Sequence, residues 1–425
     1  MPFLSSVLPM PQLPGHGTAQ LSGPDWSLWP ARVLGHADPL TIGHHAGTHR
    51  TISPDQTWSA IQPLLATAGI TRVADLTWLD DLGIPTVQAV RPASLTLSVS
   101  QGKATTYRAA QVSAAMESLE NWHVENITPD LLSTTTTELT DVLTYDPADL
   151  NRPPGSFYHP GAKLGWMAAT TLLSGRRTWV PWLATVVNIA VNDSWGPPIF
   201  GMDTTGLASG NSYHEATLHG LYEIMERYGM AAAQPGSTLF EVPIEDVGRS
   251  ECAELVDKIH RAGSELQVAR MDVWDGFYCF AAEITSPMME VPFSGSGLHH
   301  DPSVALSRAI TEAAQSRLTA ISGAREDLPS AIYQRFARMH TFAPARKAMQ
   351  PMPEADPTPW HITSTDSLGE LVAAAATAVA TVAGAEPLAV VCDFPEACVP
   401  VVKVIAPGMS ATVHSPLRTP LQEHS

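Results

Sequence analysis

Apolar and polar positions follow two different periods along this chain of 425 residues, and each period predicts its own kind of element. Apolar residues three and four apart, preceded by capping residues, predict helices at 53–68, 105–126, 210–230, 251–264, 301–322 and 371–385. Short runs rich in β-branched and aromatic residues predict strands at 71–77, 86–92, 95–100, 178–186, 199–203, 238–244, 266–274, 278–285, 387–394 and 401–407. The two kinds mix without strict alternation, which favours an α+β fold.

The predicted elements lie between two segments of different composition. Residues 1–46 form an extension rich in proline and glycine, and residues 411–425 form a tail. We expect the catalytic part to span 47–410, a length sufficient for two or three subdomains, with a loop-rich stretch at 127–163 and a proline-rich one at 343–359.

The helix at 210–230 contains two histidines but lacks the spacing of a zinc protease. His214 and His219 are five residues apart. At about 100° per residue their side chains point roughly 140° apart, so one helix cannot bring both to the same metal ion. His219 instead lies on the polar side of this helix, where a hydrogen bond to a neighbouring carboxylate would orient it.

That polar side is an acidic stripe about 120° wide. It contains Asn211, Glu215, His219, Glu223 and Glu226. A solvent-exposed helix face usually interleaves bases with its acids, whereas the only base here is Arg227, at the edge of the stripe. The pattern is compatible with an exposed face, but the unpaired acids favour a cation in front of it.

Two further helices carry polar stripes on otherwise small or apolar surfaces. These stripes are Ser113, Glu117 and Glu120 in one helix, and Arg308, Glu312 and Gln315 in the other. Three such stripes suggest polar groups that converge inside the fold. Buried carboxylates need a compensating cation, and oxygen ligands favour Mg²⁺, which binds through carboxylates and substrate phosphates. The pattern therefore predicts a Mg²⁺–nucleotide site.

Composition excludes several classes of function. The net charge of −18 provides no basic footprint for nucleic acid, and the longest apolar run, 371–385, is too short to span a bilayer. The N-terminus lacks the basic region of a signal peptide, and the four cysteines have neither zinc-ribbon nor disulfide spacing. These features predict a cytoplasmic protein with core cysteines. Walker A, dinucleotide-binding, hydrolase-elbow and kinase motifs are all missing.

Three motifs in order resemble the YcaO family. They are S-x-x-x-E-x-x-E from Ser113, N-x-x-x-E with E-x-x-E-R from Asn211 to Arg227, and E-x-x-Q-x-R from Glu312. The flanking segments "GLASGN" and "PVVKVIAPG" agree, and the resemblance covers about Gly47 to Gly408. Members of this family use ATP and Mg²⁺ to phosphorylate a backbone amide oxygen of a ribosomally made peptide. Displacement of the phosphate then gives an azoline, an amidine or a thioamide.

The resemblance assigns roles residue by residue. It implies a YcaO-like α+β fold of mixed sheets whose long helices converge on the site. Its metal ligands would be Glu117, Glu120, Glu215 and Glu226. The nucleotide and its phosphates would be held by Arg50, Thr57, Ser113, Asn211, Glu223, Arg227, Glu312, Gln315 and Arg317. Catalysis would involve Glu117, Glu226 and Arg227.

Two positions depart from the family pattern. Asn121 follows Glu120 where the family often has an arginine, so an ion pair or phosphate contact is missing. Arg317 lies on the apolar side of its helix by angular count, so it either packs as a structural residue or requires a bend. Histidines 44, 45, 49, 299 and 300 lie in loops or at a helix entry and are interpreted as surface residues.

The product and partners remain open at this level. The tail "SPLRTPLQEHS" lacks the alternating prolines of azoline-forming relatives, and no peptide-clamping zinc domain is indicated. Residues 47–103 look most like members that act alone or with a TfuA-like partner, which favours external sulfide or an internal amine as nucleophile. A homodimer is expected from the resemblance. An inactive peptide-binding scaffold and a metal-dependent hydrolase that does not use ATP remain as alternatives.

Overall fold

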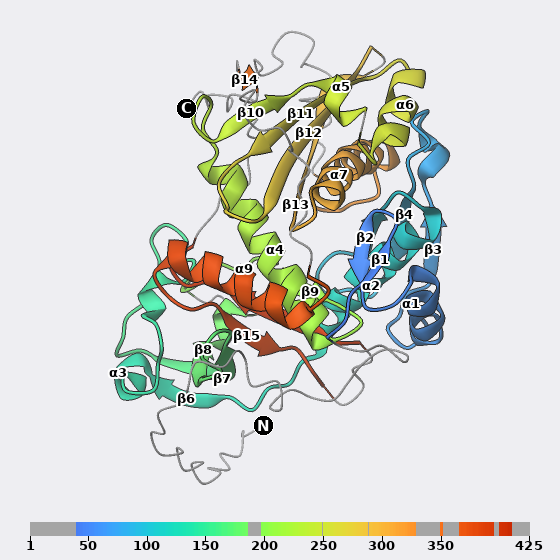
Figure 1. Ribbon diagram of the computed structural model, residues 1–425. Helices are drawn as coiled ribbons and strands as arrows, with labels where there is room; N and C mark the ends of the chain where they lie inside the picture. The colour runs from blue at the N-terminus through green and yellow to red at the C-terminus, as the bar shows by residue number, and fades with distance from the viewer. Residues whose placement is uncertain are drawn as a thin grey trace.

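The computed structural model describes residues 40–185, 197–248, 250–287, 289–328, 349–351, 365–394 and 399–409. In this part of the chain, helices pack around four β-sheets (Figure 1), and antiparallel pairing dominates. The α+β class predicted from the sequence is confirmed.

Two larger sheets form separate layers. The five-stranded sheet has the order β13-β12-β11-β10-β14, with β10 (Leu239–Val242), β11 (Glu265–Met271), β12 (Tyr278–Ser286), β13 (Met289–His299) and β14 (Gln350–Pro351). The six-stranded sheet has the order β6-β7-β15-β16-β9, and β8 pairs with β7. Its strands are β6 (Leu132–Thr135), β7 (Lys163–Thr171), β8 (Arg177–Pro181), β9 (Leu207–Ser209), β15 (Leu388–Val391) and β16 (Val401–Ile405).

Two smaller sheets carry the N-terminal part of the site. A two-stranded hairpin pairs β1 (Gly43–His45) with β2 (Thr48–Arg50). A three-stranded antiparallel sheet contains β3 (Arg72–Asp75), β4 (Thr86–Val90) and β5 (Val99–Lys103).

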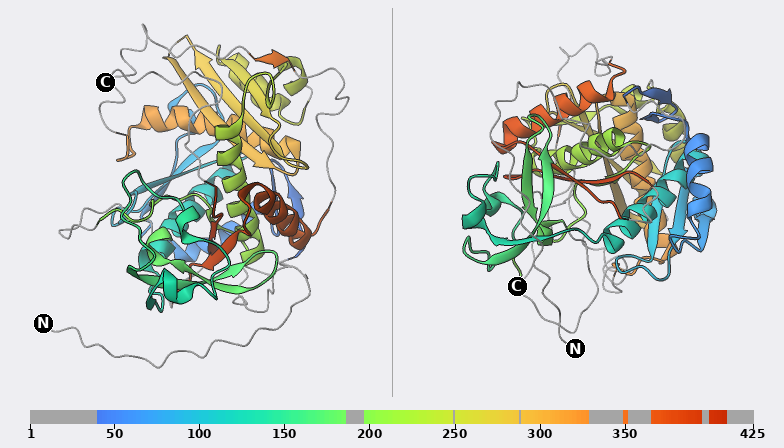
Figure 2. Two further views of the ribbon diagram at one scale, coloured as in Figure 1. Left: turned by 90° about the vertical axis from the view of Figure 1, so that its left-hand side faces the viewer. Right: turned by 90° about the horizontal axis from the view of Figure 1, so that it is seen from below.

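Long helices connect these layers. They are α1 (Pro54–Ile61), α2 (Tyr107–Asn126), α4 (Tyr213–Ala232), α7 (Pro302–Ser322) and α9 (Leu368–Ala383). Shorter helices are α3 (Thr136–Leu139), α5 (Ile244–Val247) and α6 (Ala253–Arg261). Helix α4 contacts strands of both larger sheets and packs along α9 (Figure 2). Side-chain caps start the helices as their sequences indicate: Ser53, Thr106 and Asp301 each accept backbone N–H groups.

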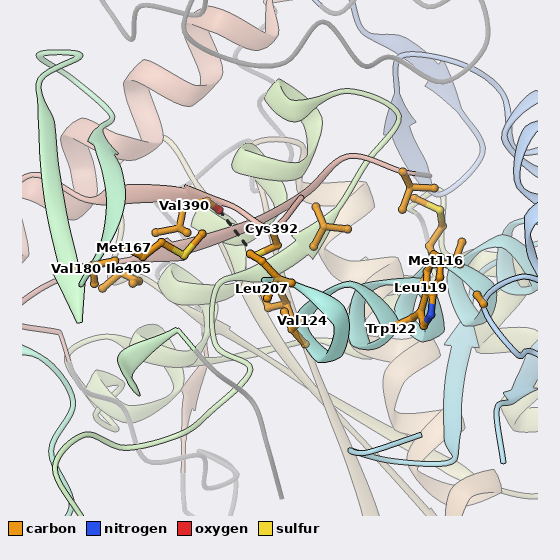
Figure 3. Packing of buried hydrophobic residues seen from close by; sticks show 14 of the residues in the cluster. Met116, Leu119, Trp122, Val124, Met167, Val180, Leu207, Val390, Cys392 and Ile405 are labelled. Atoms are coloured by element: carbon orange, nitrogen blue, oxygen red, sulfur yellow. Dashed lines mark hydrogen bonds between the residues drawn. The ribbon is translucent and has the colours of Figure 1, made fainter. Parts of the chain in front are cut away.

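The buried face of α2 fixes the position of its polar stripe. That face packs into a hydrophobic cluster shared with the six-stranded sheet through Met116, Leu119, Trp122 and Val124 (Figure 3). On the other side, β5 lies so close to α2 that a Cβ on Gly102 would come within 2.1 Å of the Ala114 nitrogen. Only glycine permits this approach, and it brings the end of β5 beside the acids of α2.

Several elements differ from the sequence prediction. Residues 199–203 do not form a strand, and the strand of that region is β9. Helix α1 ends at Ile61 and passes into a 3₁₀ turn at Pro63, because proline removes a helical hydrogen bond. Strands β7 and β13 were not predicted. The stretches 1–39 and 410–425 lie outside the described residues, as does most of 343–359.

Candidate functional site

A cavity of about 790 Å³ lies where α2, α4 and α7 meet beside β2 and β5. Its volume falls within the usual range of about 300–1,000 Å³ for ligand sites. The three predicted stripes face this cavity, which confirms that they converge inside the fold. Of the assigned residues it is lined by Arg50, Thr57, Ser113, Glu117, Glu120, Asn211, Glu215, Glu223, Glu226, Arg227, Glu312 and Gln315.

The acids of α2 are partly buried in the cavity wall and have few donors. Glu117 accepts one backbone hydrogen bond, from Gln101 N at 3.2 Å. Glu120 accepts two from Ser209, from its nitrogen at 2.8 Å and its hydroxyl at 2.6 Å. Burial raises the pKa of Glu117, and it raises the pKa of Glu120 to about 8. Loss of hydration therefore costs more than these donors return.

Glu215, near the start of α4, is held by a network of donors. Its oxygens accept from Thr51 N at 2.9 Å and from Asn211 N at 3.1 Å. Asn211 in turn accepts from the Thr57 hydroxyl at 2.8 Å. The Arg50 guanidinium lies 3.8 Å from Glu215. The N-terminal segment that carries Arg50 and Thr57, predicted to lie near the nucleotide, is thus joined to the start of α4 by direct hydrogen bonds.

Farther along α4, two glutamates occupy different environments. Glu226 accepts from the Ser296 hydroxyl at 2.7 Å and from Leu298 N at 3.0 Å, both on β13. Burial and then the nearby Glu312 raise the pKa of Glu226. Glu223 is paired with Arg227 at 2.8 Å, one turn later on the helix. Arg227 also donates to the Thr205 hydroxyl at 3.0 Å, so its guanidinium is held at the cavity edge.

Helix α7 contributes an acid, a base and an amide to the cavity: Glu312, Arg308 and Gln315. Glu312 pairs with Lys103 Nζ at 2.9 Å. Arg308 donates to His219 Nε2 at 3.0 Å, so the partner of His219 is a guanidinium and not the carboxylate expected from the sequence. The Gln315 side-chain oxygen is buried without a hydrogen-bond partner among the described residues. Such an orphaned acceptor suits a bound donor or a cation.

The electrostatics of the cavity fit a divalent cation. Glu117, Glu120 and Glu226 all have pKa values raised first of all by burial, so their negative charge is poorly compensated. A Mg²⁺ ion would supply the missing charge, and carboxylate and amide oxygens are the ligands it prefers. The positive groups Arg50, Lys103, Arg227 and Arg308 line the same cavity. Acidic and cationic side chains are therefore present together in one cavity.

The raised pKa of Glu120 predicts an opposite pH dependence for metal-free and metal-bound protein. Without metal, the raised pKa keeps a proton on Glu120 in the folded state up to about pH 8, whereas an exposed glutamate of the unfolded chain has a pKa of about 4.5. The free energy of unfolding should thus fall as pH rises from 4.5 to about 8. Mg²⁺ binds the ionised form, so its stabilising effect should grow over the same range. Thermal unfolding at several pH values, with and without Mg²⁺, measures both slopes. If the Glu120→Gln variant showed the same pH dependence of unfolding as the wild type, Glu120 would not be the group responsible.

Arg317 is the one assigned residue that does not line the cavity. Its guanidinium pairs with Asp80 at 3.1 Å and donates to the Ser286 hydroxyl at 3.2 Å. Both members of the Asp80 pair are almost fully buried. The structure therefore does not bring Arg317 together with the other assigned residues: it faces away from the polar stripe of α7 and joins this helix to the loop after β3, which agrees with a structural role. Asn121 does line the cavity and donates to Ser100 at 3.4 Å.

The histidine prediction was partly wrong. His44 is exposed, as expected, but His299 and His300 are buried, and the side chain of His49 is only 8% exposed. They are buried because β13 extends to His299 and brings this pair against the hairpin β1–β2. The three described cysteines, Cys252, Cys279 and Cys392, are buried core residues, as predicted.

Sequence reasoning missed Lys103 and Arg325, which both line the cavity. Lys103 lies in the segment "QGKA", which lacks the first glycine and the hydroxyl residue of a phosphate-binding loop. The alternation of β5 could have placed it, since Gln101 and Lys103 share one face of the strand. No local pattern marks Arg325, which follows the end of α7.

Comparisons with known proteins agree with this geometry. A family model described as YcaO cyclodehydratase, ATP- and Mg²⁺-binding, matches residues 101–410. An uncharacterised protein of Mycobacterium tuberculosis is 68% identical over 409 residues, which cover 96% of this chain and 93% of the relative. An uncharacterised protein from the tfuA 3′ region of Rhizobium leguminosarum bv. trifolii is 36% identical over 397 residues, covering 86% and 89%.

Solved structures show the same fold. YcaO from Methanopyrus kandleri bound with AMPPCP and Mg²⁺ has a TM-score of 0.63 at 23% identity, covering 87% of this chain and 94% of that one. A heterocyclase in complex with substrate and cofactor has a TM-score of 0.69 at 21% identity. The match covers 85% of this chain but only 53% of the heterocyclase. Among the described residues, no helix is long and apolar enough to cross a membrane.

Proposed function

Because the chain belongs to the YcaO family, an ATP- and Mg²⁺-binding family, we propose that it phosphorylates a backbone amide oxygen of a ribosomally made precursor peptide. A nucleophile then displaces the phosphate. One observation carries this proposal: poorly compensated acids from α2 and α4 share a single cavity with the cationic side chains Arg50, Lys103, Arg227 and Arg308. The reaction would take place in the cytoplasm, where ATP and newly made peptides meet.

The residues of the cavity have complementary tasks in this reaction. Bound Mg–ATP supplies the phosphoryl group that turns a poor leaving group, the amide oxygen, into a good one. Glu117, Glu120, Glu215 and Glu226 are proposed to hold Mg²⁺. Arg50, Arg227, Lys103 and Arg308 are proposed to neutralise the phosphates. Gln315 and Asn211 offer neutral polar groups that orient the nucleotide without adding charge.

The nucleophile is proposed to be external sulfide, and a thioamide the product. In that case sulfide attacks the amide carbon, the carbon–oxygen bond breaks and phosphate leaves, so that oxygen is exchanged for sulfur. Support comes from residues 47–103, which resemble family members that act with a TfuA-like protein, and from the 36% identical relative of the tfuA 3′ region. A TfuA-like protein is therefore the proposed partner. Ring closure to an azoline or amidine, with loss of one water, is the competing product.

Mass spectrometry of the cognate peptide tests the proposal. The chain is incubated with the peptide, ATP and Mg²⁺, with or without sulfide and a TfuA-like protein from the same genome. Oxygen-for-sulfur exchange that requires ATP would support the thioamide. Loss of one water from the peptide would support amide activation but would show that the product is a ring and not a thioamide. An unmodified peptide together with unconsumed ATP, under every combination, would reject both.

We further expect a homodimer. The resemblance to stand-alone family members is its basis, and a chain rich in apolar residues, with 11 tryptophans, offers side chains that suit an interface. Light scattering at micromolar concentration should give twice the chain mass of 45.5 kDa. A monomer mass that persists at higher concentration and in the presence of Mg–ATP would contradict this expectation.

A further inference from the structure

Three imidazole rings from distant parts of the chain meet behind the main cavity. His49 lies on β2, His299 ends β13, and His300 precedes α7. The ring centre of His49 lies 5.1 Å from the ring centre of His299 and 5.6 Å from that of His300. The ring centres of His299 and His300 are 4.1 Å apart. A ring nitrogen from each residue lies within 4.8 Å of the others. None of the three has a task in the proposed amide activation.

We propose that His49, His299 and His300 form a separate site for a zinc-class divalent cation. Imidazole nitrogens select Zn²⁺ and its first-row neighbours, whereas Mg²⁺ requires oxygen ligands. The chemistry of this donor set therefore distinguishes it from the carboxylates of the main cavity.

The surroundings keep the ring nitrogens available to a metal. Burial lowers the pKa of His49 and His299, and it lowers the pKa of His300 to about 4. All three rings are thus neutral at physiological pH, the form that binds metals. The Nδ1 atom of His49 is buried and has no hydrogen-bond partner among the described residues. A small cavity of about 10 Å³ is lined by the same three rings, and this is about the volume of one water-sized sphere.

Neighbouring groups are placed to orient the ligands. The Tyr222 hydroxyl lies 2.7 Å from His300 Nδ1, which directs the other ring nitrogen to the metal. An Asp301 carboxylate oxygen lies 3.5 Å from His49 Nε2, and carboxylates commonly support metal-binding histidines in this way. Besides burial and the neighbouring imidazoles, the positive charges of Arg308 and Arg50 lower the pKa of His299, whereas the Asp301 carboxylate acts in the opposite direction on His49 and His300.

Metal binding requires two local adjustments. Tetrahedral zinc, with ligands at about 2.0 Å, separates its ligand atoms by about 3.3 Å, so the spacing of up to 4.8 Å must close. His299 must also give up the hydrogen bond that its Nδ1 accepts from Asp301 N at 3.0 Å. The hydrogen bond is lost whichever ring nitrogen of His299 binds the metal. Binding through Nδ1 uses the accepting lone pair, and binding through Nε2 moves the ring proton to Nδ1, which then cannot accept. The short hairpin β1–β2 is the element that can move inward.

A metal at this position would fix the hairpin to the start of α7. Arg50 directly follows His49 and lines the main cavity beside Glu215. The proposed cation is thus a structural tie that positions the N-terminal strand of the nucleotide site. This structural role of the cation does not depend on the identity of the peptide substrate.

The test measures metal binding by the full chain without ATP or peptide. Protein made without a histidine tag is stripped with a chelator and titrated with Zn²⁺ in competition with a chromophoric chelator. We expect one equivalent to bind in the wild type, and His49→Gln and His300→Gln to weaken binding at least tenfold. His260→Gln, on the exposed side of α6, is the matched control and should bind as the wild type does.

Cobalt provides a readout that needs no variant. One equivalent of Co²⁺ should give the strong visible absorption of a tetrahedral site, and Zn²⁺ should abolish it. The proposal is overturned if the wild type binds no stoichiometric metal, or if the His49 and His300 variants, shown folded by circular dichroism, bind as tightly as His260→Gln. Retained Mg–ATP binding in a metal-free wild type leaves the proposed function intact.

Discussion

Replacing Glu117 or Glu215 by alanine is expected to abolish ATP turnover, with a loss of at least about 10²–10³-fold. Each change removes a proposed Mg²⁺ ligand from a site where charge develops during phosphoryl transfer. Release of phosphate in the presence of Mg–ATP and the peptide measures the effect. The matched control is Glu254→Ala in α6, since the Glu254 side chain is 78% exposed.

Glu117 gives the cleaner experiment of the two. Glu215 accepts hydrogen bonds from Thr51 and Asn211, so its removal also disturbs the fold. Within the described part of the chain, the Glu117 carboxylate accepts a single hydrogen bond, from Gln101 N, and burial raises its pKa. Glu117→Gln should therefore leave the metal-free protein as stable as the wild type, or more so, at pH 8, while Mg²⁺-dependent ATP binding by calorimetry is lost. Wild-type turnover in either alanine variant would refute the metal assignment.

Replacing Arg317 by methionine is expected to lower the free energy of unfolding by about 3–5 kcal/mol. The change leaves the carboxylate of Asp80 buried, with its side chain 1% exposed and its cationic partner removed. Denaturant unfolding measures the loss. The affinity of the folded protein for Mg–ATP should stay within about twofold, because Arg317 does not line the cavity.

A double variant separates the two possible roles of Arg317. Arg317→Met combined with Asp80→Asn removes the uncompensated charge and should recover part of the lost stability. A nucleotide contact would behave differently: affinity for Mg–ATP would fall by tenfold or more, and the change at Asp80 would not restore it. That result would return Arg317 to the nucleotide site.

The three polar stripes could be predicted from the sequence because helical periodicity is local. Residues three and four apart share a face at any position in a fold. Ser113, Glu117 and Glu120 therefore had to lie together, and their lack of bases already indicated a cation. The caps at Ser53, Thr106 and Asp301 were equally local, because each depends on the next three residues.

Other features depended on contacts that no local pattern encodes. The partner of Arg317 is Asp80, 237 positions away in the chain. His49 meets His299 only because β13 runs alongside α7 and ends at the hairpin β1–β2. Strand β13, with its glycines Gly295 and Gly297, was not predicted, because its glycines resemble a loop. The structure instead uses them for close packing, since a Cβ on Gly295 would lie 2.3 Å from the Ala313 nitrogen.

The sequence by itself determined the α+β class, the long helices and the acidic character of their polar faces. Tertiary structure decided which faces meet, because convergence depends on how the helices pack across the sheets. It also decided the charge state of the site: a glutamate in a helix has an ordinary pKa until burial removes its water, and this raises the pKa of Glu120 to about 8. The acidic side chains are given by the sequence, whereas the uncompensated charge that favours a metal ion arises because the fold buries them together.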